Sequence, residues 1–528
     1  MPFNPPHLDY HGLAPEIIVT LTLAVVLVAD LFLDRSRKWL LSNLAAFGLV
    51  CAMAPILSLA LSSTDVRSMA GGAYVVDNFA LVLKGLFLGV GFVVLLMSIN
   101  YVDEGDYYEG EFYFLLLCSL LGMMVMASAR DLITIFVALE TLSIPAYLLA
   151  AWRKRDDKSN EAGLKYYLMG VFASGVMLYG MSLIFGVTGS TVLTEISQKL
   201  GNDHSAIVTL GVVFCVIGFA FKVSAVPFHT WAPDTYEGAP TPVTAFLSVL
   251  SKAAGFVAII ELVYVGFFGQ HDVWQPMFWA LAAASMTVGN LVALRQTNIV
   301  RLFAYSSIAQ GGYIIAPLAV ATLANRNDDL SAIVVYLLAY GAMNLGAFAV
   351  ILAVARKTRS GEISSYGGLF EYAPGLAVLM TAGGVGTVAG SLAARFKGAW
   401  EWRRAYQVGL GCMAFDLLAC AMLPSFWLLL PVFVIGGFGN GFALVHDRLL
   451  LSHAAPESMH GRLFALQKAC TSGAFAISFL SAGAMIAFGG VQIAFLAAGI
   501  GLLCVIVAVS PRLRAAWPTP APPAPSPA

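Results

Sequence analysis

Long apolar stretches separated by short polar loops organise almost the whole chain. A helix needs about 20 predominantly apolar residues to cross the hydrocarbon core of a bilayer. By that criterion the pattern predicts spanning helices near residues 15–33, 39–61, 77–100, 112–128, 132–151, 163–186, 206–226, 241–266, 276–294, 299–321 and 330–354. Further spans are predicted near 374–394, 406–423, 425–445, 464–488 and 490–510. The predicted fold is therefore an all-α polytopic transmembrane helical bundle of about 16 spans.

The composition agrees with this class. Hydrophobic residues make up 59% of the 528 residues and charged residues only 11%, and the mean hydropathy is +0.82. Such a chain is an integral membrane protein, so the lipid bilayer is its first expected partner. The net charge of −1 argues against a nucleic-acid partner. The seven cysteines are scattered without a CxxC motif, so we interpret them as core residues rather than metal or iron–sulfur ligands.

Short basic loops predict the orientation, because Lys and Arg gather on the cytoplasmic side of a membrane. The basic loops at residues 35–38, 152–155, 295–301 and 355–359 all follow odd-numbered predicted spans. They agree on one orientation, with the N-terminus outside.

The basic loops beyond residue 360 do not agree with this orientation. Residues 395–404, 446–462 and 510–514 agree with one another but are out of phase with the earlier loops by one crossing. Either segment 374–394 does not span simply, or two differently oriented modules are joined near residues 375–385.

Glu140, Lys222 and Lys252 stand inside apolar, helix-length segments. A charge at bilayer depth costs about 2.5 kcal/mol or more. The two lysines flank the proline-broken stretch PFHTWAPDTYEGAPTP, residues 227–242. Irregular backbone at this depth is tolerated where it is buried in protein or lines a wet cavity, and broken helices with charged neighbours recur at ion sites. The pattern predicts an ion pathway, and the residue types point to protons.

Glu140 and Lys222 are the predicted switch of this pathway, and Lys252 is the next predicted relay. Desolvation lowers the proton affinity of a buried amine and a neighbouring carboxylate raises it, so a Lys–Glu pair can be switched electrostatically. The alternative is a static buried ion pair that fixes helix packing. His229 lies in the break and is a further candidate relay, because imidazole titrates near neutral pH. A hydrogen-bonded packing role is the alternative for His229.

We expect structural roles for the other polar side chains. We expect Glu237 to cap the following helix together with Thr241, and Glu261 to reach the membrane interface. Lys84 is expected either to contact a neighbouring subunit or to extend to the surface. The polar side chains around Ser307 are expected to form interhelical hydrogen bonds or to support a chain of water molecules.

Long specific runs carry a family resemblance. They are GEFYFLLLCSLLGMMVMASARDLITIFVALETLSIPAYLLAAW, SNEAGLKYYLMGVFASG, FKVSAVPFHTWAPDTYEGAPTPVTAFLSVLSKAAGF, ALRQTNIVRLFAYSSIAQGGYIIAPL and SSYGGLFEYAPGLAVLMT. Through them, residues 1 to about 380 closely resemble subunit N of bacterial proton-translocating NADH-quinone oxidoreductase, respiratory complex I. This family belongs to the antiporter-like subunits, which carry two inverted five-helix repeats with one broken helix in each.

The resemblance implies the following properties. The predicted helices 4–8 match the first repeat with its broken helix 7, and Glu140, Lys222 and Lys252 match the family's functional positions. It implies a multi-pass subunit of the bacterial cell membrane that itself binds no cofactor. NADH, FMN, iron–sulfur clusters and quinone are then expected on partner subunits. The implied partners are the other membrane-arm subunits of complex I, and the quinone pool is reached only indirectly.

After about residue 380 the family pattern stops. The runs GGFGNG and HGRLFALQ resemble the last five helices of a major facilitator superfamily transporter. We therefore expect an incomplete second repeat, and we do not equate Lys397, in a polar basic loop, with the family's second-repeat lysine. The predicted regions are 1–111 (helices 1–3), 112–266 (first repeat), 267–380 (partial second repeat), 381–514 (major-facilitator-like helices) and 515–528 (disordered Pro/Ala-rich tail).

The predicted function is proton translocation by a non-redox subunit of NADH:quinone oxidoreductase. NADH oxidation and quinone reduction in partner subunits would supply the energy. One alternative is a secondary transporter, either a cation/proton antiporter or a drug exporter. The other is an impaired hybrid of two membrane proteins.

Overall fold

The computed structural model describes residues 8–34, 37–62, 66–105, 109–201, 203–322, 326–358 and 360–366, together with residues 408, 411–413, 415 and 500. By its contacts the chain divides into two units, Met1–Gly367 and Gly368–Ala528. All elements described below belong to the first unit.

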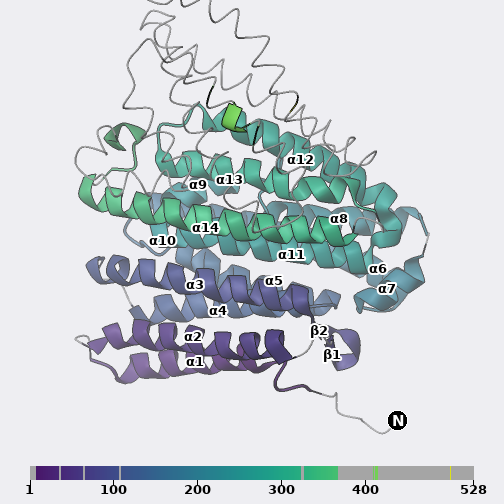
Figure 1. Cartoon of the computed structure of the whole chain (residues 1–528), viewed down its shortest axis with the longest axis horizontal. Coiled ribbons are helices and arrows are strands. Elements are labelled where there is room, and N and C mark those ends of the chain that lie inside the picture. Colours follow the sequence, from purple (N-terminus) through teal and green to yellow (C-terminus); the bar gives the residue numbers. More distant parts are fainter. Residues whose placement is uncertain are drawn as a thin grey trace, which may run out of the picture. The chain divides into compact units, whose positions relative to one another are not determined.

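The N-terminal helices α1, α2 and α3 lie side by side, and a short hairpin connects α2 to α3 (Figure 1). Their apolar residues surround each helix instead of forming one stripe, which is typical of helices in an apolar environment. The bounds are α1 (Ala14–Phe32), α2 (Trp39–Ser62), β1 (Arg67–Met69), the 3-10 turn η2 (Ala70–Gly72), β2 (Tyr74–Val76) and α3 (Asn78–Glu104). β1 and β2 pair antiparallel.

The next helices form the layers that hold the broken helix. Their bounds are α4 (Glu109–Ser128), α5 (Leu132–Ala150), α6 (Asp157–Thr188), α7 (Leu193–Leu200) and α8 (Ala206–Lys222). Aspartate side chains cap the N-termini of α3, α5 and α6: Asp77, Asp131 and Asp156 accept hydrogen bonds from the first free backbone N–H groups. The helix α7 was not predicted, because its eight residues are too few to show an apolar span.

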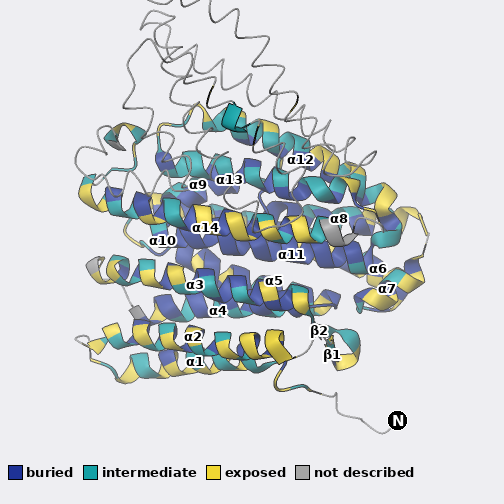
Figure 2. Ribbon diagram, in the orientation of Figure 1, coloured by how far each residue is buried: buried dark blue, intermediate teal, exposed yellow. Residues whose placement is uncertain are grey.

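One central helix is interrupted by one π-helical turn and ends in another. It comprises α10 (Thr241–Phe246), the π turn η3 (Leu247–Ser251), α11 (Lys252–Glu261) and the π turn η4 (Leu262–Gly266). The most apolar 18 residues of the span Thr241–Gly266 are all buried, and Figure 2 shows α11 in the colour of buried residues. π turns are rare and often mark functional sites.

The remaining described elements follow this central helix. The short helix α9 (Trp231–Gly238) precedes it. After it come the 3-10 turn η5 (Phe268–Gln270), α12 (His271–Ala293), α13 (Ile299–Ile315), the 3-10 turn η6 (Ala316–Val320), α14 (Arg326–Thr358) and the 3-10 turn η7 (Ile363–Tyr366). The helices α12 and α13 pack against each other, and α14 packs against α3 and α10.

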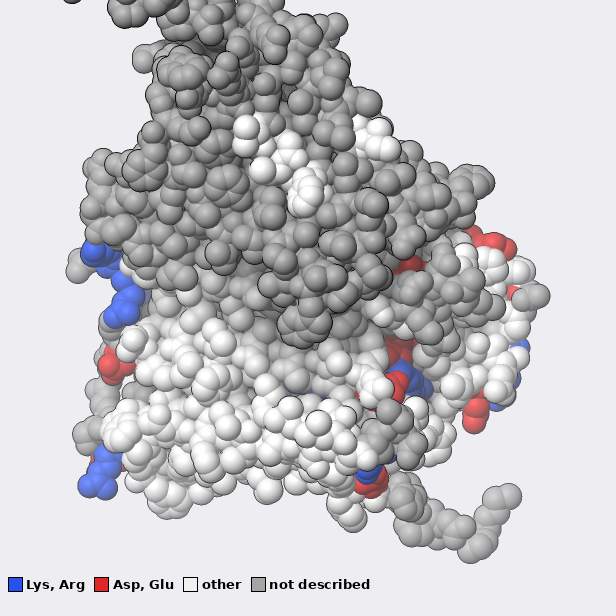
Figure 3. All heavy atoms as spheres, in the orientation of Figure 1, with Lys and Arg blue, Asp and Glu red and all other residues white. Residues whose placement is uncertain are grey.

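Each spanning segment predicted before residue 360 contains a helix at the expected place. In the described part of the chain, nine helices are long and apolar enough to cross a membrane, and Ala206–Lys222 is a shorter apolar helix. On the face shown in Figure 3 the described charged side chains gather towards the two ends of the helices, with an almost uncharged belt between them. The spans predicted after residue 370 fall almost entirely outside the described residues, so their number stays a prediction.

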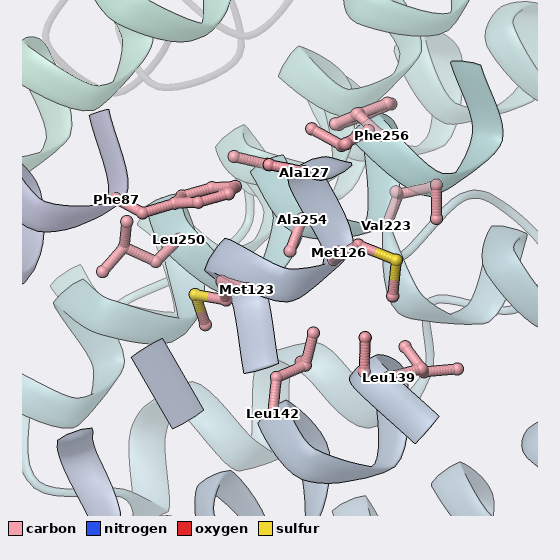
Figure 4. Packing of buried hydrophobic residues seen from close by; sticks show 14 of the residues in the cluster. Phe87, Met123, Met126, Ala127, Leu139, Leu142, Val223, Leu250, Ala254 and Phe256 are labelled. Carbon is pink, nitrogen blue, oxygen red and sulfur yellow. The ribbon is translucent and has the colours of Figure 1, made fainter. Parts of the chain in front are cut away.

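An apolar layer separates α3 and α4 from the central helix. Phe87 of α3 and Met123 and Met126 of α4 face Leu250 and Ala254 of the central helix (Figure 4). All five side chains are fully buried. Such close packing leaves no room for water on this side of the central helix.

Two charges lie in surroundings that the sequence did not predict. Lys84 does not extend to the surface: its side chain is 0% exposed and pairs at 2.7 Å with Glu16 of α1. Glu261 lies at the end of α11 but is buried, and it pairs with Arg130, which also binds Asp77 at 2.8 Å. The bulk of the surrounding helices leaves these long side chains no route to solvent, so opposite charges compensate them instead.

Candidate functional site

The site is built around the break between α8 and α9. The helix α8 ends at Lys222, and α9 begins at Trp231, which confirms the predicted interruption of this helix. Proline lacks a backbone N–H group and disfavours the helical conformation of the preceding residue, so Pro227 cannot continue α8. Ser224 within the break has a positive φ of 58°, an unusual conformation for a residue other than glycine.

Side chains from neighbouring segments satisfy the backbone groups that the break exposes. The indole Nε1 of Trp231 donates to the carbonyl oxygen of Phe221 at 3.0 Å. The backbone N–H of Val226 donates to the hydroxyl of Ser285 on α12 at 2.9 Å. Unpaired backbone groups are costly in an apolar environment, so these bonds allow an irregular segment to persist between helices.

Lys222 donates hydrogen bonds to two hydroxyl groups. Its Nζ lies 2.8 Å from Ser143 Oγ on α5 and 3.2 Å from the hydroxyl of Tyr166 on α6. It also lies 5.5 Å from the centre of the Tyr166 ring, within the range of a cation–π contact. The lysine is 2% exposed, so these groups replace the water that would otherwise solvate the ammonium.

Glu140 lies one helical turn before Ser143 on α5. In the described part of the chain it forms no direct ion pair with Lys222, although it is within electrostatic reach of the lysine. Its side chain is half-buried, and its Oε1 atom is buried without a hydrogen-bond partner. The hydrogen bond that Lys222 makes to α5 therefore goes to Ser143 and not to Glu140.

Tyr166 is held rigidly by aromatic neighbours. Its ring stacks on Trp231 with centroids 4.4 Å apart and an interplanar angle of 11°. The ring of Tyr147 meets it edge-on at 4.6 Å. The hydroxyl lies 3.4 Å from Ser251 Oγ, at the end of the π turn η3. Tyr166 is thus the contact between Lys222 and the residue directly before Lys252.

Lys252 turns away from Tyr166 towards α13. Its Nζ donates to the backbone oxygen of Ser307 at 3.0 Å and also to the Ser307 hydroxyl. The hydroxyl of Tyr236 lies 3.4 Å from the same Ser307 oxygen, and the Tyr236 ring is 5.9 Å from Nζ. The interhelical hydrogen bonding predicted for Ser307 is confirmed, with Lys252 as its partner.

His229 lies in the break as predicted, but at the edge of the lysine cluster. Its ring is half-buried, with its centroid 6.5 Å from the ring centroid of Tyr305. Its Nδ1 atom is buried without a hydrogen-bond partner. Electrostatic interaction reaches from Lys252 to His229. Its role as a relay stays a prediction.

The sequence did not predict a second cluster of charged residues, which lies at the end of α9. Arg301 of α13 binds Asp234 at 2.7 Å and Glu237 at 2.9 Å. Lys165 binds Asp234 at 2.6 Å, and Lys158 binds Glu237 at 2.9 Å. The prediction that Glu237 caps the next helix was wrong, and Arg301 does more than mark the cytoplasmic side. The spacing of the two carboxylates, three residues apart on one helical face, was the available signal.

Together these contacts place two buried amines and several hydroxyls in one polar cluster. Amines at Lys222 and Lys252 alternate with hydroxyls that can both accept and donate a proton. Both lysines belong to this cluster, Glu140 lies one helical turn from its member Ser143, and His229 lies at its edge. Sequence reasoning missed Ser143, Tyr166 and Ser251. Hydroxyl residues are common in membrane helices, and only the rotation of each helix decides which of them meet.

The fold and site define a multi-pass membrane protein of the antiporter-like class, with a broken helix and buried lysines. The chain belongs to the NADH:quinone oxidoreductase/Mrp antiporter family of transmembrane proteins, whose model matches residues 129–406. This match covers the break and both lysines. It also extends past residue 380, where the recognisable sequence pattern ended.

Known proteins are similar over most of the chain. NAD(P)H-quinone oxidoreductase subunit 2 of Synechococcus elongatus is 44% identical over 382 residues, covering 71% of this chain and 72% of that protein. NADH-quinone oxidoreductase subunit N 2 of Symbiobacterium thermophilum is 44% identical over 394 residues, covering 69% and 76%. A chain of respiratory complex I from Thermus thermophilus, solved with bound aureothin, is 27% identical with a TM-score of 0.58, covering 94% and 98%.

Proposed function

We propose that this chain is the N-type membrane subunit of a proton-translocating NADH-quinone oxidoreductase, and that protons pass along Glu140, Lys222 and Lys252. The observation that carries the proposal is the pair of almost fully buried lysines beside a broken helix, each bound to hydroxyls. The family membership and the names of the relatives support the assignment to this complex. NADH, FMN, iron–sulfur clusters and quinone belong to partner subunits in this proposal.

The other membrane-arm subunits are the proposed partners, and one face is suited to meet them. Along α5 the exposed residues Ile133, Val137, Ile144 and Leu148 form an apolar stripe. Glu140 lies within the same stretch of helix and is half-buried. A carboxylate at mid-helix depth is costly beside lipid, so a neighbouring subunit that covers this face would complete its surroundings. The proposed location is the bacterial cell membrane, with the N-terminus outside on the basis of the basic loops.

The proposed cycle begins with a charge or conformational change in that neighbouring subunit. A change in the field at Glu140 alters how strongly Lys222 holds its proton, because the lysine is bound to Ser143, one helical turn after Glu140 on α5. Lys222 then releases its proton towards Lys252, and it is reloaded before the next turn. His229 is proposed as a further relay at the break, where it lies within electrostatic reach of Lys252.

The test is the number of protons moved per electron by the assembled complex in membrane vesicles. Lys222→Met removes the amine and keeps an unbranched side chain of similar length. We expect a lower proton-to-electron ratio with the complex still assembled. The matched control is Lys199→Met, because Lys199 is an exposed lysine on α7 outside the path. An unchanged ratio in Lys222→Met would overturn the proposal.

A second candidate function is cation/proton antiport by the chain alone, favoured by a family that includes Mrp antiporters. It predicts Na⁺- or K⁺-driven proton exchange by the purified chain in liposomes, and this exchange would be lost in Lys222→Met. Proton movement only in the presence of the other subunits and NADH would rule it out. The major-facilitator-like segment after residue 380 and the hybrid interpretation stay predictions. Copurification of a C-terminally tagged chain with the complex tests both.

A further inference from the structure

Tyr166 is the residue through which the two lysines of the path are connected. The described contacts include no hydrogen bond between Lys222 and Lys252. Instead, the Tyr166 hydroxyl lies 3.2 Å from Lys222 Nζ and 3.4 Å from Ser251 Oγ. Ser251 directly precedes Lys252. We propose that the hydroxyl of Tyr166 carries the proton between Lys222 and the Lys252 segment, an inference that rests on the proposed function above.

The chemistry of the groups favours this path. An ammonium group can only donate hydrogen bonds, whereas a hydroxyl group accepts one proton while it donates its own. Lys222 donates to two hydroxyls on different helices, Ser143 beside Glu140 and Tyr166 beside Ser251. The lysine thus has one contact on its input side and one on its output side. Tyr166 is the output contact.

The surroundings hold the Tyr166 hydroxyl in place. The ring stacks on Trp231 from the broken helix and meets Tyr147 of α5 edge-on. The side chain is 0% exposed. A buried tyrosine held on both sides keeps its hydroxyl within reach of both partners, which is the positioning that proton transfer requires. The stacking also links Tyr166 to α9, so movement of the broken helix would move this contact.

The rotation between consecutive residues of a helix explains why Ser251 and Lys252 can serve different sides. Consecutive residues of a regular helix point about 100° apart. Ser251 closes the π turn η3 and faces Tyr166 of α6, while Lys252 opens α11 and faces Ser307 of α13. The central helix therefore receives a proton on one side and passes it on from the other. The apolar layer towards α4 leaves no competing polar route at Leu250 and Ala254.

The transfer balances as follows. The N–H bond of the Lys222 ammonium breaks as Tyr166 Oη gains that proton, and the original Tyr166 proton moves to Ser251 Oγ. Ser251 passes its own proton to a water molecule, which delivers one to the neutral amine of Lys252. Lys222 ends neutral and Lys252 ends protonated, while both hydroxyls and the water are unchanged in composition. Rotation of the hydroxyls and reloading of Lys222 from the Glu140 side restore the starting state.

Tyr166→Phe in the assembled complex tests this role, because phenylalanine keeps the ring stacked on Trp231 and removes only the hydroxyl. We expect the proton-to-electron ratio to fall by as much as it falls in Lys222→Met. The matched control is Tyr179→Phe, on the same helix but 56% exposed, which should keep the normal ratio. Ser251→Ala removes the next hydroxyl and should repeat the loss. It also decides the question if the Tyr166→Phe complex does not assemble.

A further readout separates a relay from a purely structural hydrogen bond. Incorporation of 3-fluorotyrosine at position 166 keeps the ring and the hydroxyl but makes the hydroxyl more acidic. A relay predicts pumping with a displaced pH profile, whereas a structural role predicts the normal profile and overturns the inference. Normal pumping in both Tyr166→Phe and Ser251→Ala, with a loss in Lys222→Met, would also overturn it while leaving the proposed function intact. Normal pumping in Lys222→Met would instead refute the proposed function.

Discussion

The ammonium of Lys222 lies 2.8 Å from the hydroxyl of Ser143, one helical turn beyond Glu140 on the same helix. The lysine therefore binds a hydroxyl on α5 and not the carboxylate that was expected to pair with it. A hydrogen bond to a charged group contributes about 1.5–3 kcal/mol, so Ser143 is well placed to adjust how firmly the lysine keeps its proton. In the proposed switch, Lys222 would therefore respond to a side chain that carries no charge.

Ser143→Ala is expected to lower the proton-to-electron ratio of the complex, because Lys222 loses its partner on the Glu140 side. If Ser143 transmits the influence of Glu140, the double variant Glu140→Gln/Ser143→Ala should be no worse than Glu140→Gln alone. Independent, additive losses would contradict this coupling. Thr141→Ala is the matched control, since the Thr141 hydroxyl binds only the backbone oxygen of Val137 and is exposed.

Lys84→Met should destabilise the N-terminal helices by about 3–5 kcal/mol, because Glu16 would remain buried without its partner. Replacing both residues, as Glu16→Gln/Lys84→Met, should restore most of the loss. The measurement is thermal denaturation of the purified complex, with the fraction of this subunit that stays bound as the readout. A double variant as unstable as the single one would show that the charges matter separately and not as a pair.

Ser224→Gly should be tolerated and should stabilise the break by about 1 kcal/mol, since glycine adopts a positive φ without strain. Ser224→Val should destabilise it, because a β-branched residue is poorly accommodated there. Ser98→Gly in the right-handed helix α3 is the comparison, with an expected loss of about 0.5–1 kcal/mol. Thermal unfolding of the complex shows whether each substitution raises or lowers its stability. Equal losses at both serines would refute the strain at Ser224.

The start of α1 should loosen in acid. The hydrogen bond from Arg67 lowers the pKa of Asp9, partial burial opposes this effect, and the backbone N–H of Gly12 adds to the lowering. Because the folded pKa lies below the unfolded one, the stabilisation is complete above about pH 4 and is lost as the pH falls through the folded pKa.

Asp9→Asn should therefore speed hydrogen exchange at the N-terminus of α1 already at neutral pH. In the unchanged protein the same acceleration is expected only below about pH 4, after correction for the intrinsic pH dependence of exchange. Asp203→Asn, which alters a comparable turn before Ser205, is the control and should leave α1 unaffected. An identical exchange profile for Asp9→Asn and the unchanged protein would contradict this prediction.

Much of the described fold follows from local properties of the chain. Apolar length predicts a spanning helix without knowledge of its neighbours, and the helices found before residue 360 lie where these stretches place them. The break is equally local, because Pro227 cannot continue a helix. Lys222 and Lys252 could be singled out because a charge in an apolar stretch is costly wherever the helix packs.

The contacts that these charged side chains make could not be predicted from the sequence in the same way. A lysine in an apolar helix has several possible partners, and the rotation and packing of the surrounding helices choose among them. Lys84 illustrates this: its partner Glu16 is 68 residues away in the chain. Glu261 likewise pairs with Arg130 of a distant segment.

The sequence by itself determined the membrane class, the order of the helices, the break and the two lysines of the proposed path. Only the tertiary structure decided that Ser143 and Tyr166 receive the hydrogen bonds of Lys222, and that Ser307 receives those of Lys252. The physical reason is the range of the forces involved. Burial of apolar length acts segment by segment, whereas a hydrogen bond forms only when two groups from different helices meet within about 3 Å.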